Sequence, residues 1–369
     1  MLTKFAVTNY RGFENRIELD LSSPSNYEFN RYVIKDNVVK NGIIYGPNGS
    51  GKTNFGLAIF DIEYHLAPLK AKKPDYYNNF VYAGAVDQPV VFEYTFKFGT
   101  QVVEYIYSKK GYGMLVSEML RVDGEEIFNR DNNSLKINGK YFPNENHITE
   151  NLKNSANNIS VLNFLSTYYP LDADNYILKL QEFANKMLWF RCLDVREFIG
   201  VETQENGNIE EYIISNNFVK DFAGFLADIS RQKFDFVQPQ KGDKQLWYKI
   251  GNNAVSFNQT VSTGTRSLEL LFFWMKRMND AKFVFIDEFD AFYHFDLAFR
   301  LCKYMFNLDC QLFLSSHNTY LMTNELLRPD CNFILNKNSI KPLNGCTDKE
   351  LRFGHNMEKI YRAGAFYDE

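Results

Sequence analysis

The sequence predicts a mixed α/β fold, in which a parallel sheet carrying a phosphate-binding loop is joined to an antiparallel sheet and a short helical insertion. Three observations predict it. A glycine-rich loop at 46–53 lies between an apolar run and a helix-like segment. Two further apolar runs, at 283–286 and 312–314, end in acidic or polar residues, as strands of a buried parallel sheet do. Residues 90–98 alternate in polarity, which is typical of a half-buried antiparallel strand.

The composition is that of an ordinary globular protein. The chain has 369 residues, of which 45% are hydrophobic and 23% charged, and this length can bury a substantial core. Its 41 Lys and Arg are outnumbered by 45 Asp and Glu, for a formal net charge of −4. Such a chain has no overall basic field to draw it onto nucleic acid or anionic lipid. The composition does not exclude a local basic patch.

Cysteines and apolar runs indicate a cytoplasmic protein without a membrane anchor. The five cysteines are odd in number, show no C-x-x-C spacing, and are read as reduced, mostly buried thiols rather than disulfides or zinc ligands. The first 21 residues lack the continuous apolar stretch of a secretory signal. No run approaches the roughly 18–20 apolar residues that span a bilayer.

The strongest local signal is "NGIIYGPNGSGKTNF" at 41–55, which contains a G-x-x-x-x-G-K-[ST] pattern between a short apolar strand and a helix-like segment. Glycines let successive backbone N–H groups turn toward an anion, and the helix that follows adds its positive end. Lys52 would reach the β- and γ-phosphates of ATP, and Thr53 would be a ligand of Mg²⁺. The candidate nucleotide-binding residues here are Gly46, Asn48, Gly49, Ser50, Gly51, Lys52, Thr53 and Asn54.

Residues 1–149 are expected to form the first half of the ATPase lobe, with the phosphate loop and an antiparallel sheet. Val90, Phe92, Tyr94, Phe96 and Phe98 would share one face of a strand. The dipeptides at 123–124 (Asp-Gly) and 138–139 (Asn-Gly) are hairpin-turn signals.

Residues 150–232 are expected to form a helical insertion. Both "NISVLNFLSTYY" at 158–169 and "NYILKLQEFANKMLWFRCL" at 175–193 have helix-like apolar spacing. No sustained heptad repeat appears, so a coiled-coil arm is not expected, and the insertion would serve as a lid or a partner surface. Strand-like sequence returns at 233–237 and 244–250, within a C-terminal half of the ATPase lobe at 233–369.

Two segments of this C-terminal half carry candidate chemistry. The strand "FVFI" delivers Asp287, a candidate ligand of Mg²⁺, and Glu288, a candidate general base for the attacking water. The next strand ends at His317, which could reach a γ-phosphate. Upstream, Ser and Thr directly before the apolar run 266–278 predict a helix cap.

These elements resemble ABC-type ATPases of the P-loop NTPase class, and within them the SMC-like group that includes RecF, the double-strand-break-repair clamps and the OLD family. In that group a Ser-Gly-containing motif caps a helix whose end faces the γ-phosphate bound by the opposite protomer. The resemblance therefore implies a signature that acts in trans, with ATP held between two chains. The motif would comprise Ser262, Thr263, Gly264 and Thr265, and Gly264 precedes Asp287 by 23 residues.

The resemblance extends to both ends of the chain. Asn9-Tyr10-Arg11 matches the Asn-aromatic-basic element of the opening strand pair, which makes Arg11 a candidate phosphate contact. The tail "LRFGHNMEKIYRAGAFYDE" resembles ATPases of bacterial abortive-infection and anti-phage operons, of the AriA-like or AbiL-like kind. Gln88 is only a weak candidate for the glutamine-loop residue, and the Ser-Thr-Gly-Thr motif argues against a transporter ATPase.

The favoured function is an ATPase that dimerises on ATP and Mg²⁺ and controls a separate effector, a nuclease or toxin, in anti-phage defence. A RecF-like ATPase that clamps duplex DNA is the alternative, although the acidic net charge does not favour DNA. A second alternative is a non-hydrolysing, ATP-dependent scaffold, against which Glu288 argues. We expect a homodimer or higher homo-oligomer in the cytoplasm.

Overall fold

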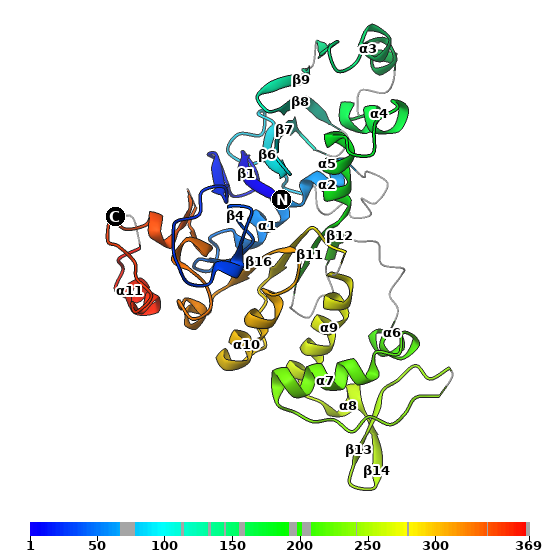
Figure 1. Ribbon diagram of the computed structural model, residues 1–369, viewed down its shortest axis with the longest axis vertical. Coiled ribbons are helices and arrows are strands. Elements are labelled where there is room, and N and C mark those ends of the chain that lie inside the picture. Colours follow the sequence, from blue (N-terminus) through cyan, green and yellow to red (C-terminus); the bar gives the residue numbers. More distant parts are fainter. Residues whose placement is uncertain are drawn as a thin grey trace.

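The computed structural model describes residues 1–66, 78–111, 114–131, 134–143, 145–154, 159–191, 198–200, 208–240, 242–278, 280–337 and 339–366. In this part of the chain, two seven-stranded sheets form the upper lobe and the middle of the elongated molecule in Figure 1.

The first sheet is the predicted parallel sheet. Its five inner strands are mutually parallel, and only the two edge strands run antiparallel to their neighbours. The inner strands are buried along nearly their whole length, which explains their continuous apolar sequences. In spatial order the strands are β12 (Phe198–Gly200), β11 (Met187–Arg191), β15 (Phe283–Asp287), β16 (Gln311–Ser316), β5 (Asn41–Tyr45), β17 (Asn332–Leu335) and β18 (Ile340–Pro342).

The second sheet is antiparallel and forms the upper lobe in Figure 1. On the predicted strand 90–98, alternate residues from Val90 to Phe96 are buried, and Phe98 is partly buried. The turn between β8 and β9 has positive φ at Asp123 (50°) and Gly124 (82°), as a two-residue hairpin turn requires. The strand order is β10 (Leu135–Ile137), β9 (Glu125–Arg130), β8 (Leu115–Val122), β7 (Gln101–Lys109), β6 (Val90–Phe98), β1 (Leu2–Thr8) and β2 (Ile17–Asp20).

The second predicted hairpin, at Asn138-Gly139, is wrong. The chain does turn there, because the N–H groups of Tyr141 and Phe142 both donate to the carbonyl of Asn138 at 3.0 Å. The next described element is helix α3 (Glu145–Asn154) rather than a returning strand. Phe142 is buried, so a core contact directs the chain inward after the turn.

The helix after the phosphate loop lies between the two sheets. α1 (Lys52–Ile59) presents Gly56 to the ring of Phe285 on β15, where a Cβ would stand only 2.6 Å from that ring. On its other side, the Tyr94 hydroxyl of β6 donates to the carbonyl of Ala58 at 3.1 Å. A second short helix, α2 (Asp61–Leu66), follows directly. Helix α1 therefore couples the phosphate loop to both sheets.

The segment 150–232 is not a single helical insertion, because the chain passes through the parallel sheet in its middle. α4 (Val161–Tyr168) and α5 (Tyr176–Asn185) pack beside the antiparallel lobe, where buried Glu118 of β8 accepts the N–H of Val161 at 2.8 Å. "MLWFR", expected to continue the helix, is instead strand β11. A short apolar run fits either state, and pairing with β15 selects the strand here. α6 (Ile209–Ser215) and α7 (Val219–Ser230) follow below the sheet.

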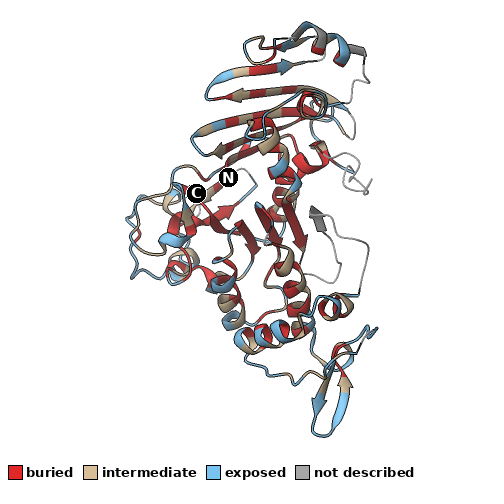
Figure 2. Cartoon of the chain, turned by 45° about the vertical axis from the view of Figure 1, so that its right-hand side comes forward, coloured by how far each residue is buried: buried red, intermediate tan, exposed pale blue. Residues whose placement is uncertain are grey.

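The remaining elements surround the parallel sheet. A hairpin of β13 (Trp247–Ile250) and β14 (Asn253–Ser256) projects from the lower end and is largely exposed (Figure 2). The longest helix among the described residues has 16 residues, too short for a coiled-coil arm. Further elements are β3 (Ile34–Lys35), β4 (Val38–Val39), α8 (Phe257–Thr260), α9 (Thr263–Met278), α10 (Phe295–Met305) and α11 (Met357–Arg362).

Four of the five cysteines lie within the described residues. In the described part of the chain, Cys302, Cys310 and Cys331 are buried, Cys346 is partly buried, and all four are free thiols. Cys192 lies outside the described residues. Among the described helices, none combines the length and apolar character that crossing a bilayer requires.

Candidate nucleotide site

Four neighbouring parallel strands end at the same edge of the sheet and carry the candidate residues. In spatial order they are β11, β15, β16 and β5, whose last residues are Arg191, Asp287, Ser316 and Tyr45. The carboxyl edge of a parallel sheet is where α/β proteins bind ligands. The topology thereby assembles segments that lie far apart in the sequence.

The phosphate loop has the backbone geometry of an anion site. Gly49 and Gly51 have φ of 77° and 100°, a region that favours glycine. A Cβ on Gly46 would lie 2.5 Å from the carbonyl oxygen of Leu335, and one on Gly51 would lie 2.7 Å from the Phe13 ring. The hydroxyl of Ser50 is buried without a hydrogen-bond partner among the described residues. These features fit a loop shaped to receive a phosphate chain.

Lys52 is a buried cation at the start of α1. Its ammonium donates to the carbonyl oxygen of Gly46 at 2.8 Å and of Pro47 at 3.3 Å, so its side chain folds back over the loop. Burial lowers the pKa of Lys52, whereas the nearby carboxylates of Asp287 and Glu288 oppose that shift. A phosphate anion would compensate this buried charge.

Thr53 and Asp287 form the candidate magnesium site. The Thr53 hydroxyl donates to Asp287 Oδ2 at 2.7 Å, and the Ser315 hydroxyl donates to Asp287 Oδ1 at 2.6 Å. Burial raises the pKa of Asp287, while these two hydrogen bonds and Arg191 act in the opposite direction. A hydroxyl and a carboxylate at this separation are the oxygen donors that Mg²⁺ takes beside a phosphate loop, so the residues fit the ion.

Glu288 stands at a sharp turn of the backbone. Its φ is 48°, in the left-handed region, and its N–H donates to the Ser315 hydroxyl at 2.8 Å. This turn follows immediately after buried Asp287 and leaves the Glu288 side chain partly exposed. A non-glycine residue held in this conformation is a feature that functional sites often show.

His317 follows β16 and lies beside Lys52. Its Nδ1 atom is 3.4 Å from Lys52 Nζ. Two effects lower the pKa of His317 below its usual value: partial burial is the larger, and the positive charge of Lys52 is the second. A neutral imidazole next to Lys52 can accept a hydrogen bond from the ammonium.

Arg11 lies on the other side of the phosphate loop. Its guanidinium donates to Asn54 Oδ1 at 3.1 Å, and its backbone has a left-handed φ of 49°. Both residues line a cavity of about 590 Å³ that also includes Phe80 and Val81. The structure thus brings Arg11 and Asn54 together at a hollow next to helix α1.

The expected signature residues cap helix α9. The Ser262 hydroxyl accepts the N–H of Thr265 at 3.2 Å, while Ser262 and Thr263 are exposed to solvent. Gly264 faces the carbonyl of Phe292, from which a Cβ would be 3.3 Å away. In Figure 1 this end of α9, next to α8, lies well away from α1. In the described part of the chain, no hydrogen bond or ion pair joins 262–265 to residues 46–54.

Arg191 is a site residue that sequence reasoning missed. Its guanidinium lies 3.5 Å from Asp287 Oδ2 and donates to Glu288 Oε1 at 3.2 Å. Its only sequence signal is its place directly after the run "MLWF", which the sequence predicts to continue a helix. Gln88, the weak glutamine-loop candidate, is exposed in a turn, where its carbonyl accepts from Asn9.

Comparison with known families identifies the class. Residues 43–323 match a family described as "AAA domain, putative AbiEii toxin, Type IV TA system". The chain belongs to this AAA family. The match runs from the strand before the phosphate loop to the residues just beyond His317, so it includes both halves of the candidate site apart from Arg11.

Solved structures that resemble this AAA domain include SMC heads. The head domain from Thermotoga maritima has 15% identity and a TM-score of 0.45, with 92% of this chain and 98% of that chain covered. A head bound to the C-terminal winged-helix domain of ScpA has 13% identity and a TM-score of 0.45, covering 92% and 96%. A head with an extended coiled coil, bound to a ScpA domain from Pyrococcus furiosus, has 13% identity and a TM-score of 0.44, covering 92% and 95%. No curated protein matches the chain significantly.

The predicted fold class is confirmed. The AAA domain is an α/β P-loop protein, with an antiparallel β lobe next to its parallel sheet. The finer assignment to AriA-like or AbiL-like proteins stays a prediction.

Proposed function

We propose that this AAA domain binds ATP with Mg²⁺, hydrolyses it, and uses the cycle to switch a separate effector. The observation that carries the proposal is the convergence of Lys52, the Thr53–Asp287 pair, Glu288 and His317 at one edge of the parallel sheet. Phosphoryl transfer to water needs a cation at the phosphates, oxygen ligands for Mg²⁺ and a base, and these side chains would supply them.

The roles follow from the contacts. The loop N–H groups and Lys52 would hold the β- and γ-phosphates, and Thr53 and Asp287 would hold Mg²⁺. When bound, the ion supplies charge stabilisation to the phosphate oxygens. Glu288 would orient a water molecule and accept its proton, for which its carboxylate must first leave Arg191.

Dimerisation is part of the same proposal. The amino end of α9 is exposed, capped and remote from the phosphate loop of its own chain. The amino end of a helix attracts anions, so it can complete the phosphate site of a second copy. We propose that two chains close on two ATP molecules in this way.

The setting that we propose is anti-phage defence in the bacterial cytoplasm, with a nuclease or toxin as effector. The family's description, which refers to a toxin of a type IV toxin–antitoxin system, supports this setting. The acidic net charge of −4 gives no support to a duplex-DNA clamp.

Hydrolysis by two site variants tests the proposal. Lys52→Ala removes the charge over the phosphate loop, and Glu288→Gln removes the base. Each should lower the rate of phosphate release from ATP by about a hundredfold or more. Glu288→Gln should still bind ATP, because the phosphate and metal contacts remain, whereas Lys52→Ala should bind it weakly.

Lys136→Ala, at an exposed position of β10, is the matched control and should hydrolyse ATP at the wild-type rate. Wild-type turnover in Lys52→Ala would refute the nucleotide site. If the wild-type chain binds ATP and dimerises but releases no phosphate, the hypothesis of a non-hydrolysing scaffold replaces that of an ATPase.

A further inference from the structure

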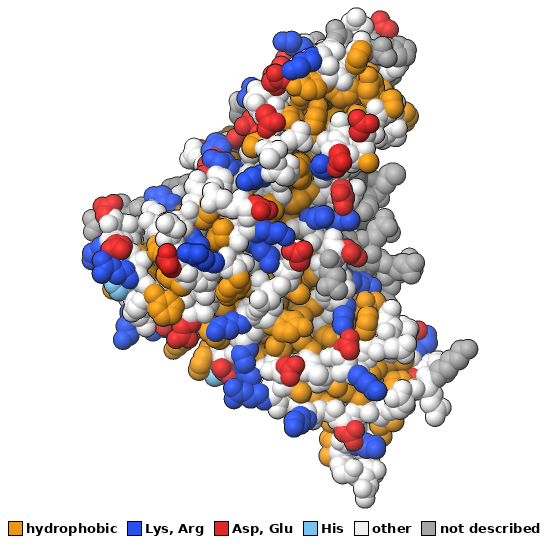
Figure 3. Space-filling model, in the orientation of Figure 1, with side chains coloured by type: hydrophobic (Ala, Val, Ile, Leu, Met, Phe, Trp, Pro, Cys, Tyr) orange, Lys and Arg blue, Asp and Glu red, His pale blue; other side chains and the backbone are white. Residues whose placement is uncertain are grey.

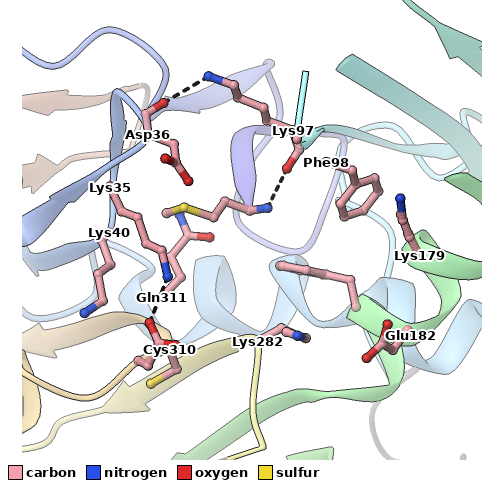
Figure 4. Close-up of a pocket in the computed structure, with 14 residues that line it drawn as sticks. Lys35, Asp36, Lys40, Lys97, Phe98, Lys179, Glu182, Lys282, Cys310 and Gln311 are labelled. Carbon is pink, nitrogen blue, oxygen red and sulfur yellow. Dashed lines mark hydrogen bonds and ion pairs between the residues drawn. The ribbon is translucent and has the colours of Figure 1, made fainter. Parts of the chain in front are cut away.

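A second cavity lies at the opposite edge of the parallel sheet, where the strands begin. Its volume is about 420 Å³ (Figure 4). Lys40, Lys282 and Cys310, which directly precede β5, β15 and β16, line one side. Lys97 of β6 and Lys179 of α5 line the other, so the two sheets and α5 enclose it.

The lining of this cavity is rich in lysine. Figure 3 shows Lys and Arg side chains, with acidic ones between them, across the middle of the face on which Figure 1 marks the N-terminus. Five lysines line the cavity against the three carboxylates of Asp36, Glu182 and Asp309. Two of these carboxylates already have partners: Asp309 pairs with Lys35 at 2.8 Å, and Glu182 with Lys186, outside the cavity, at 2.8 Å.

Three of the lining lysines have no carboxylate partner among the described residues. The Lys97 ammonium donates to the backbone carbonyl of Asp36 at 3.0 Å, and neither Lys40 nor Lys282 makes an ion pair within that part of the chain. Lys40 is only 9% exposed, and this burial lowers its pKa. A buried cation without a partner is costly, so an anion entering here would relieve an existing penalty.

This cavity is separate from the nucleotide site. Lys282 precedes the first residue of β15, whereas Asp287 is its last residue. At about 3.3 Å per residue, the two ends are about 17 Å apart along the strand. The two sites therefore lie at opposite ends of the same parallel strands.

We propose that the lysine-lined cavity binds a small anion carrying two or more phosphate groups. Ammonium groups are point charges that bind phosphate oxygens from several directions. A volume of about 420 Å³ falls in the range of small-molecule sites. The lysines of β3, β6 and α5 and those before β5 and β15 line one hollow rather than following a surface track, which favours a compact ligand over a nucleic-acid backbone.

Lysine footprinting with inorganic tripolyphosphate tests the proposal at the cavity itself. The wild-type chain is acylated briefly with and without the anion, and each lysine is quantified by mass spectrometry. Lys97, Lys179 and Lys282 should react at least threefold more slowly with the anion present. The exposed Lys136 and Lys249, on β10 and β13, should react at unchanged rates. This readout does not depend on whether the other edge of the sheet binds ATP.

Calorimetry on paired variants gives the second measurement. Lys97→Gln/Lys282→Gln should bind tripolyphosphate at the cavity at least tenfold more weakly than Lys136→Gln/Lys249→Gln, with both proteins melting at similar temperatures. Both substituted cavity lysines are at least partly exposed, so the fold should tolerate the change.

The proposal would be overturned if tripolyphosphate slowed the acylation of the three cavity lysines and the two control lysines equally. It would also be overturned if the two double variants bound the anion with equal affinity. Protection of the same three lysines by a short DNA duplex, but not by tripolyphosphate, would also overturn it in favour of a nucleic-acid surface.

Discussion

At the scale of single residues, the decisive arrangement is the pairing of Arg191 with two carboxylates. The guanidinium contacts Asp287, the candidate metal ligand, and Glu288, the candidate base. Glu288 is also held in a left-handed conformation, which costs of the order of 1 kcal/mol or more for a non-glycine residue. Arg191 therefore offsets the negative charges of both carboxylates, which a bound metal ion would otherwise help to offset.

Substitution of Arg191 should strengthen metal binding. A cation that enters the site competes with this guanidinium for Asp287, so Arg191→Gln should raise the affinity for Mn²⁺ in the presence of ADP about fivefold, equivalent to about 1 kcal/mol. Electron paramagnetic resonance of the free Mn²⁺ measures this affinity directly. Arg191→Lys retains the charge and is the matched control. An affinity that stays at the wild-type value in Arg191→Gln would show that the ion pair does not compete with the metal.

The second prediction at this scale concerns the pH dependence of His317. Burial and Lys52 both disfavour the charged imidazole, so its titration midpoint should lie below the usual 6.5. Less than half of the rings should then carry a proton at pH 6.5, and Lys52→Met should move the midpoint upward. Nuclear magnetic resonance of the ring C–H signals follows the titration. A wild-type midpoint at or above 6.5 would contradict the proximity of Lys52 and His317.

At the scale of elements, helix α9 combines a structural cap with an exposed amino end. Ser262 satisfies the N–H of Thr265, which stabilises the first turn. Gly264 is closely packed against the carbonyl of Phe292, so a larger residue there would disturb the fold as well as any anion. Thr263 is the exposed first residue of the helix and is the better position for a test.

Thr263→Glu should separate the cap from the proposed role in trans. A carboxylate at the start of a helix interacts favourably with the helix dipole, so stability should be unchanged or slightly higher. The same charge should repel the γ-phosphate of a partner and abolish ATP-dependent dimerisation, which light scattering detects. The neutral control Thr263→Gln should dimerise. A Thr263→Glu chain that dimerises normally with ATP would limit this element to its structural role.

At the scale of the whole molecule, the capped end of α9 lies well away from α1, the helix that follows the phosphate loop (Figure 1). We propose that a complete site is therefore built from two chains. The proposed dimer has two equivalent sites, each built from the loop of one chain and the α9 end of the other.

Mixing two inactive variants should therefore restore activity. In a dimer of Lys52→Ala with Thr263→Glu, one site carries both lesions and the other carries neither. Phosphate release from the equimolar mixture should reach up to about a quarter of the wild-type rate, since about half of randomly formed dimers are mixed and each has one intact site of two. Each variant alone sets the baseline. A mixture no faster than that baseline would argue against sites shared between chains.

The phosphate loop, the acidic strand end and the cap of α9 could be predicted from short stretches of sequence. These features depend on short segments whose composition allows little else: glycines at positive φ, a buried apolar run before two carboxylates, and hydroxyls before a helix. The alternation at 90–98 likewise determined which face of β6 is buried.

Contacts between residues that are distant in the sequence depend on the three-dimensional fold. The run "MLWF" is compatible with helix or strand, and its parallel pairing with β15 made it a strand and brought Arg191 to Glu288, 97 residues away. The lysine-lined cavity depends in the same way on strand order, because Lys40, Lys97 and Lys282 share no local pattern. Sheet pairing is set by packing over the whole core, and for that reason no short segment of the sequence could reveal these contacts.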